Sequence, residues 1–111
     1  MSHQNYESCI AACSASAVES LRCASACLGE PDIKMLVDCI RLDRDCSAIC
    51  LLAVQAMAGG SQFANDICQL CAEICTACAV ECEKHAHMEH CKKCAAACYK
   101  CAAECGKMIS M

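Results

Sequence analysis

Cysteines recur at helical spacing along the chain, most clearly in the stretch CQLCAEICTACAVEC from Cys68 to Cys82. Its five cysteines are separated by steps of three, four, three and four residues. Residues three and four apart share one face of an α-helix, with Cβ atoms about 5–6 Å apart. A zinc–thiolate bond is about 2.3 Å long, so one ion that bridges two such sulfurs nearly spans this gap. The spacing therefore predicts that each CxxxC pair is a two-sulfur clamp for a metal ion.

Seven cysteine pairs in the chain have the CxxxC spacing, and three single cysteines are expected to face the same interior. One buried cysteine is usually only a small packed residue. Chance placement would put many of them on outer faces, where charged residues such as Glu73 and Lys92 occur instead. The predicted metal ligands are therefore all 17 cysteines, namely Cys9, Cys13, Cys23, Cys27, Cys39, Cys46, Cys50, Cys68, Cys71, Cys75, Cys78, Cys82, Cys91, Cys94, Cys98, Cys101 and Cys105.

The number of thiols indicates which ion is expected. A zinc or ferrous site with four thiolates carries a charge of about −2, and several such sites would bury too much negative charge in one core. A monovalent ion paired with one thiolate leaves the core nearly neutral, and soft sulfur ligands select Cu(I). We therefore expect multiple Cu(I) ions per protomer. A zinc or mixed soft-metal thiolate buffer and a thiol redox module are the alternatives.

Three histidines gather in the segment EKHAHMEHC. His85, His87 and His90 are either uptake ligands at the mouth of the core or parts of a solvated polar turn, and the two interpretations have equal weight. His85 and His87 are favoured as ligands because they fall in phase with the cysteine stripes. All three are retained as candidate metal ligands.

Four helices must position these side chains. Gly29 and Pro31 mark one break, and Gly59, Gly60 and Ser61 mark another, with Ser61 as a plausible N-cap. A phase change in the cysteine pattern places the third break near residues 86–89. The expected helices span roughly residues 5–28, 32–57, 62–85 and 89–108. The short loops predict an all-α, antiparallel up-down-up-down four-helix bundle with a cysteine-lined core, as a single domain over residues 1–111.

Charge and composition exclude several functions. The net charge of −4 gives no basic surface for nucleic acid, and no apolar run is long enough to cross a membrane. The start MSHQNYESC has no export signal, so we expect a cytoplasmic protein whose thiols stay reduced. The odd cysteine count also makes a disulfide scaffold the weaker interpretation. No nucleophile–base pair or phosphate loop is evident, so no enzyme activity is expected.

Charged residues also interrupt one cysteine-rich segment, CIRLDRDC. Arg41, Asp43, Arg44 and Asp45 are interpreted as a salt-bridged outer face or a contact between protomers.

The segments CIRLDRDCSAICLLA and ICQLCAEICTACAVECEKHAHMEHCKKCAAACYKCAAEC closely resemble the bacterial four-helix-bundle copper storage proteins of the cytosolic type. The resemblance covers residues 39–108, and the first helix matches less well. It implies storage of many Cu(I) ions in the bundle interior, histidines near the open end and assembly into a homotetramer. We expect small thiol carriers or chaperones to donate the copper. The family's rhythm in the first helix would place cysteines at Ser16 and Ser20, where a hydroxyl is a poor Cu(I) ligand.

Overall fold

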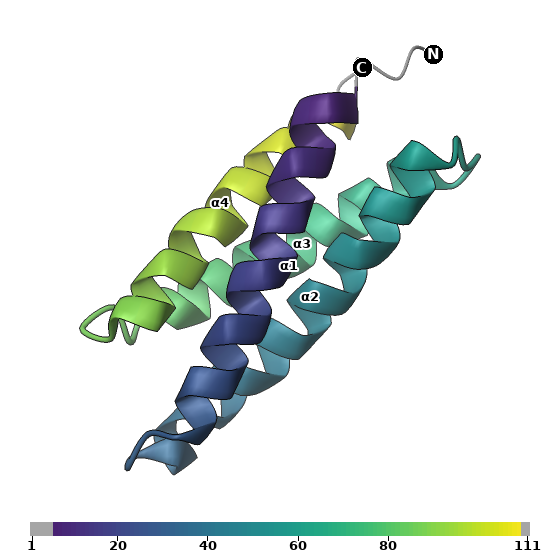
Figure 1. Cartoon of the computed structure of the whole chain (residues 1–111). Helices are drawn as coiled ribbons and strands as arrows, with labels where there is room; N and C mark the ends of the chain where they lie inside the picture. The colour runs from purple at the N-terminus through teal and green to yellow at the C-terminus, as the bar shows by residue number, and fades with distance from the viewer. Residues whose placement is uncertain (1–5, 110–111) are drawn as a thin grey trace.

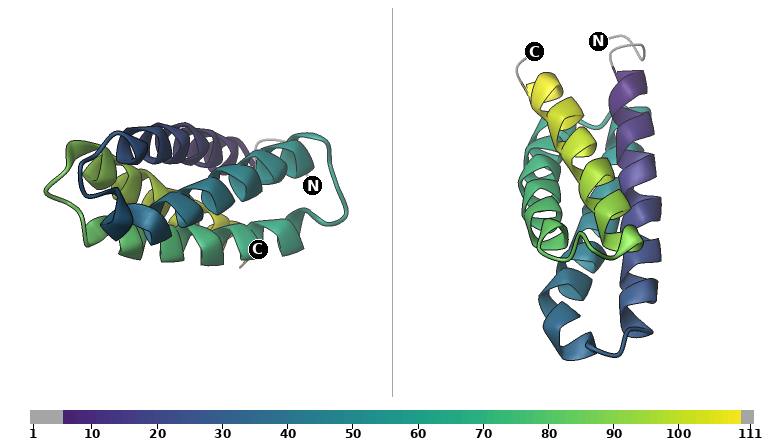
Figure 2. Two further views of the ribbon diagram at one scale, coloured as in Figure 1. Left: turned by 90° about the horizontal axis from the view of Figure 1, so that it is seen from below. Right: turned by 90° about the vertical axis from the view of Figure 1, so that its left-hand side faces the viewer.

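Four α-helices form one antiparallel bundle in the computed structural model, which describes residues 6–109 (Figure 1). The elements are α1 (Glu7–Leu28), the short 3-10 helix η2 (Ile33–Leu36), α2 (Val37–Ala58), α3 (Ala64–Glu83) and α4 (Glu89–Ile109). Each helix packs against its two neighbours in the ring, α1 against α2 and α4, and α3 against α2 and α4. The bundle measures 48 × 18 × 17 Å (Figure 2). The predicted all-α four-helix bundle is confirmed.

The start of the second helix differs from its prediction at residue 32. Residues 33–36 form η2, whose first turn is closed by a 2.9 Å bond from the Met35 N–H to the Asp32 carbonyl. This tighter turn directs Leu36, only 2% exposed, onto the end of the core before α2 begins at Val37. Burial of Leu36 thus explains the late start of α2. The predicted start of the first helix, residue 5, lies outside the described residues.

The turn between α2 and α3 depends on Gly60. Its φ of +68° lies in the left-handed region, which side chains with a Cβ rarely adopt. The backbone N–H of Ser61 then bonds back to the Ala56 carbonyl at 2.9 Å, which closes the end of α2. The Ser61 hydroxyl accepts a 3.1 Å bond from the Phe63 N–H, and α3 begins at Ala64. The N-cap of α3 is Phe63, so the prediction of Ser61 as the N-cap is wrong, and Ser61 instead organises the turn two residues earlier.

The core of the bundle consists mainly of cysteine and alanine. Each of the 17 cysteines is at most 1% exposed, while Leu36 and Met57 are the largest apolar side chains that are fully buried. A thiol side chain removes less apolar area from water than leucine does, so the hydrophobic effect holds this core less strongly. No helix within residues 6–109 has the length and apolar character needed to cross a lipid bilayer.

Candidate metal centre

All 17 cysteines are free thiols and buried, and every helix contributes some of them. The stripes predicted from the spacings of three and four residues face one another along the bundle axis. Neighbouring sulfurs lie between 3.4 Å, as for Cys13 and Cys101, and 3.9 Å, as for Cys23 and Cys27. The thiols therefore form a nearly continuous network inside the protein.

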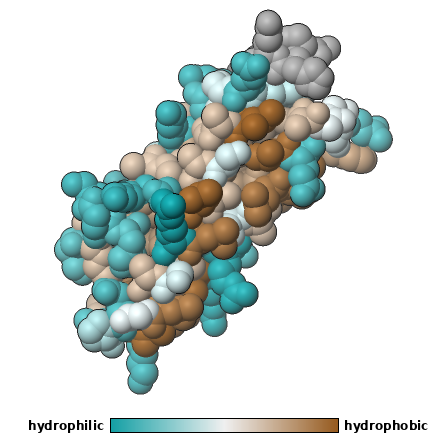
Figure 3. All heavy atoms as spheres, in the orientation of Figure 1, coloured by the Kyte–Doolittle hydropathy of each residue, from teal (hydrophilic) through white to brown (hydrophobic). Residues whose placement is uncertain are grey.

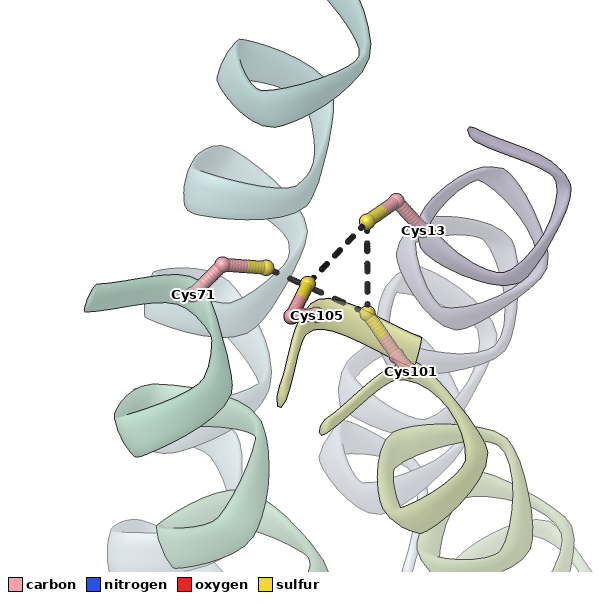
Figure 4. Close-up of side chains that lie close together, drawn as sticks. All are labelled: Cys13, Cys71, Cys101 and Cys105. Atoms are coloured by element: carbon pink, nitrogen blue, oxygen red, sulfur yellow. Dashed lines mark hydrogen bonds between the residues drawn. The ribbon is translucent and has the colours of Figure 1, made fainter. Parts of the chain in front are cut away.

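One four-thiol group lies near the end of the bundle where α1 begins and α4 ends (Figure 4). Cys13 from α1, Cys71 from α3, and Cys101 and Cys105 from α4 point toward one another, and their sulfurs all lie within 4.8 Å of each other. The Cys13 sulfur is 3.4 Å from that of Cys101 and 3.7 Å from that of Cys105. Three helices thus converge on one point of the core.

A second four-thiol group adjoins the first and shares two of its members. Cys50 joins Cys71, Cys75 and Cys101, again with all four sulfurs within 4.8 Å. The Cys50 sulfur lies 3.7 Å from Cys71, 3.5 Å from Cys75 and 3.7 Å from Cys101. Because the groups share the sulfurs of Cys71 and Cys101, ions bound in both groups would share a thiolate ligand.

These separations suit a small soft ion. With a metal–sulfur bond of about 2.3 Å, two sulfurs at a trigonal angle around one ion are about 4 Å apart, and two in a linear arrangement about 4.6 Å apart. The observed separations of 3.5–3.8 Å around Cys50 and Cys75 are close to the trigonal value. The sulfurs are therefore already close to the separations that a trigonal metal–thiolate site needs.

Asp43 is a core residue, and its interpretation as part of an outer face is wrong. Its carboxylate is fully buried and accepts bonds from the thiols of Cys78 at 3.1 Å and Cys94 at 3.2 Å. Cys82 also donates to Asp43, at 3.6 Å. Asp43 lies on the same face of α2 as Cys39, Cys46 and Cys50, since residues 39, 43, 46 and 50 are separated by steps of four, three and four. This spacing alone is a signal that Asp43 faces the core. Arg41, Arg44 and Asp45 are exposed.

The environment of Asp43 favours its neutral form. Burial is the main cause that raises the pKa of this carboxyl to about 8. Binding of a metal ion through Asp43 would therefore displace this proton, as it does at the thiols. Two close groups of candidate ligands contain it, one with Cys23, Cys39 and Cys82 and one with Cys78, Cys82 and Cys94.

The three histidines occupy different positions at the opposite end of the bundle, which we call the mouth. His90 contacts thiols directly, with its Nδ1 atom 3.5 Å from Cys91, 3.6 Å from Cys23 and 3.9 Å from Cys27. The Nε2 atom of His90 is buried and has no hydrogen-bond partner among residues 6–109. His90 therefore completes a close group of three thiols and one imidazole.

His85 and His87, favoured by the sequence phase, lie outside this group of thiols. His85 is 9% exposed and pairs through Nε2 with Glu81 at 3.3 Å, while His87 is exposed. Both line a hollow of about 210 Å³ with Met35 and Met88. This hollow lies outside the core, between η2 and the α3–α4 turn.

Burial keeps two thiols near the mouth, those of Cys27 and Cys91, protonated in the absence of metal. It is the main cause that raises the pKa of Cys27 to about 11, and it also raises the pKa of Cys91. A thiolate is the form that binds metal, so metal must displace the proton. At the other end, hydrogen bonding with Cys105 and Cys9 raises the pKa of Cys68.

The chain forms a four-helix bundle whose interior is lined with reduced thiols, and an imidazole lies at its mouth. These features define a metal–thiolate binding protein. The family model for the copper storage protein matches residues 2–110. The chain therefore belongs to the copper storage protein family.

Individual relatives support this assignment. The uncharacterized cysteine-rich protein YhjQ of Bacillus subtilis is 49% identical over 84 residues, which cover 76% of this chain and 78% of the relative. The Cu(I)-bound copper storage protein BsCsp3 is 47% identical with a TM-score of 0.91, and the match covers 95% of this chain and 98% of the other. A cytosolic copper storage protein from Streptomyces lividans, loaded with five coppers, has 34% identity, a TM-score of 0.94, and coverage of 98% and 95%.

Proposed function

We propose that this protein stores Cu(I) as a lattice of cuprous thiolates inside the bundle. The observation that carries the proposal is the network of buried free thiols with sulfur separations of 3.4–3.9 Å. The proposed ligands are all 17 cysteines, with Asp43 and His90 as additional donors within the close groups. His85 and His87 are proposed as transient ligands beside the mouth.

Charge balance supports a monovalent ion in this core. Each thiol that loses its proton leaves one negative charge, and one Cu(I) per thiolate restores neutrality. Divalent ions held by four thiolates would each leave a charge of about −2 in a buried site, which is costly to desolvate. Sulfur is also the ligand type that selects Cu(I) among the available metals.

The named relatives support both the ion and the compartment. One is described as Cu(I)-bound and the other as a cytosolic copper storage protein. We assign this protein to the cytosol, where glutathione and thioredoxin keep thiols reduced. Copper would arrive on small thiol carriers or a chaperone and pass to the core through His90. The role is storage and buffering, without catalysis.

Assembly into a homotetramer is part of the proposal. Val18, Leu21, Leu51 and Leu52 are 45–51% exposed on α1 and α2. Figure 3 shows apolar residues gathered in a band over these two helices. Contact with further copies of the chain would cover these side chains. Light scattering on the reduced protein is expected to give four times the protomer mass, and a monomer would contradict this part of the proposal.

Anaerobic titration of the reduced apo protein with Cu(I) tests the storage role. Saturation is expected near one ion per thiol, that is, near 17 per protomer. Zinc added to the copper-loaded protein should displace no copper. Saturation at about four ions, or displacement by zinc, would support a divalent-metal buffer instead. Consumption of thiols by disulfide formation during the titration would support a redox module.

A further inference from the structure

The inward stripe of α1 contains two residues that are not thiols. Its members are residues 9, 13, 16, 20, 23 and 27, with steps of four and three, and the two in the middle are Ser16 and Ser20. Both serines are 0% exposed, like the cysteines of the same stripe. At this level of the bundle, α2, α3 and α4 present thiols, and α1 presents hydroxyls.

Ser16 lies against three thiols that come from three different helices. Its Oγ atom is 3.4 Å from the sulfur of Cys46 in α2, 3.6 Å from Cys98 in α4 and 3.9 Å from Cys75 in α3. A hydroxyl has one proton to donate, and every one of these neighbours is sulfur.

Ser20 lies one turn further toward the mouth and contacts α4. Its Oγ atom is 3.7 Å from the sulfur of Cys94 and 3.7 Å from that of Cys98. Cys98 is therefore flanked by both hydroxyls, and its sulfur is also 3.6 Å from Cys46. We call Ser16, Ser20, Cys46, Cys94 and Cys98 the central layer.

The hydroxyls of the central layer are poorly matched to neutral thiols. A buried hydroxyl without a good hydrogen bond costs free energy, and a neutral thiol is only a weak donor and acceptor. A thiolate is a much better acceptor because hydrogen bonds to ionised groups are roughly twice as strong as neutral ones. The same hydroxyl is thus better satisfied when its neighbouring sulfur has lost a proton to metal binding.

We propose that Ser16 and Ser20 are positioning residues that each donate one hydrogen bond to a metal-bound thiolate and so favour the copper-loaded form. The acceptor of Ser16 is Cys46 or Cys98, and that of Ser20 is Cys94 or Cys98. This inference rests on the proposed function of the core as a Cu(I) store. Each Cu(I) that binds displaces the proton of a thiol, which leaves as H⁺, and the serine O–H then points at the resulting thiolate. No electron is transferred, and both serines remain protonated.

The same contacts predict that the two serines also limit the number of Cu(I) ions that the core can bind. In the α1 stripe, position 16 holds a hydroxyl. A thiol at this position would face the sulfurs of Cys46, Cys75 and Cys98 at distances that allow them to bind one ion together. Ser16→Cys and Ser20→Cys should each raise the Cu(I) capacity by about one ion, since each adds one thiolate charge to be neutralised.

Competition with a colorimetric Cu(I) chelator, under anaerobic conditions, tests the proposal on wild type and on Ser16→Ala, Ser20→Ala and the double variant. Wild type and the alanine variants should load the same number of ions. The ions bound at the central layer should be lost from the double variant at roughly tenfold lower chelator concentration than from wild type, because their thiolates no longer accept hydrogen bonds from the two hydroxyls. The thermal midpoint of the apo double variant should equal or exceed that of wild type.

Ser47→Ala is the matched control. Ser47 is 5% exposed, but its hydroxyl donates to the Arg44 carbonyl at 2.9 Å, and within residues 6–109 it makes no hydrogen bond to a thiol. This variant should retain wild-type copper affinity. Equal chelator competition for wild type and the double alanine variant, or equal losses in Ser47→Ala, would overturn the proposal. Failure of wild type itself to load near its thiol count would instead reject the proposed storage function.

Discussion

The two halves of the core differ in the atoms that they offer to a metal. The far half, where α1 begins and α4 ends, contains the thiol-only groups around Cys50 and Cys105. In the mouth half, each of the close groups described above includes the carboxylate of Asp43 or the imidazole of His90. The far half comprises Cys9, Cys13, Cys50, Cys68, Cys71, Cys75, Cys101 and Cys105, and the mouth half Cys23, Cys27, Cys39, Cys78, Cys82 and Cys91. Cys46, Cys94 and Cys98 belong to the central layer between them.

This difference indicates that the two halves of the core bind Cu(I) with different affinities. Thiolate is a better Cu(I) ligand than carboxylate or imidazole, so the far half should hold copper more tightly. Oxygen and nitrogen donors near the mouth should give weaker sites, and we propose that ions exchange with thiol carriers there. The central layer with Ser16 and Ser20 separates the two halves.

The largest expected effect is the increase in thermal stability on copper loading. Ligands that bind only the folded state stabilise it, and this apo core buries little apolar area. Full loading is expected to raise the unfolding temperature by more than about 10 °C. Hydrogen exchange at substoichiometric copper should show protection of the far half first. An unchanged unfolding temperature would contradict stabilisation by copper. Earlier protection at the mouth would contradict tighter copper binding in the far half.

Removal of one thiol from each half should change capacity unequally. Cys101 lies 3.4–3.9 Å from four other sulfurs, those of Cys13, Cys50, Cys71 and Cys75. Cys101→Ser should therefore lose more than one Cu(I) per protomer, because several ions share its sulfur. Cys27→Ser, the matched mouth variant, should lose about one. Anaerobic titration measures both, and equal losses would argue against shared thiolates in the far half.

Asp43 should make the stability of the reduced apo protein depend on pH. Its pKa rises from an ordinary 3.8 to about 8 on folding. Between these values the folded state keeps a proton that the unfolded state has lost, so stability falls as pH rises through this window. Each unit of difference is worth about 1.4 kcal/mol.

Urea unfolding at about pH 5 and about pH 7.5 measures this dependence. Asp43→Asn has a neutral side chain of similar size and should show a smaller decrease in the free energy of unfolding across the same interval. A decrease as large as that of wild type would show that Asp43 is not the titrating group, and a stability that rises with pH would contradict its raised pKa.

His90 should affect the rate of copper uptake, which is the smallest of the expected effects. His90→Ala removes the imidazole that contacts Cys23, Cys27 and Cys91, while leaving every thiol in place. Stopped-flow mixing with a Cu(I)–chelator complex should show a several-fold slower uptake with a nearly unchanged endpoint. His87→Ala, at an exposed position, should be closer to wild type. Identical uptake rates for His90→Ala and His87→Ala would show that His90 does not take part in copper uptake.

Much of the architecture could be predicted from the sequence because cysteine spacing reports helix phase directly. The four helices, their antiparallel order and the inward direction of the thiols all follow from steps of three and four residues and two glycine-containing breaks. The start of α2 could not be predicted in this way, since it depends on the packing of Leu36 against the core.

The polar members of the site were harder to predict. Asp43 shares the phase of Cys39 and Cys46, but its position among other charged residues suggested a surface role. His90 is adjacent to Cys91 in the chain, and its contact with Cys23 and Cys27 depends on how α1 and α4 pack, which spacing within one helix does not report. Side chains that reach across helices therefore need the three-dimensional structure.

A crystal structure of the protein after anaerobic Cu(I) loading, with anomalous scattering recorded at the copper edge, tests the central claim most directly. We expect a column of copper peaks along the bundle axis, each bonded to cysteine sulfurs and most densely spaced in the far half. Copper confined to surface histidines, or sulfurs joined in disulfides with no metal between them, would contradict it.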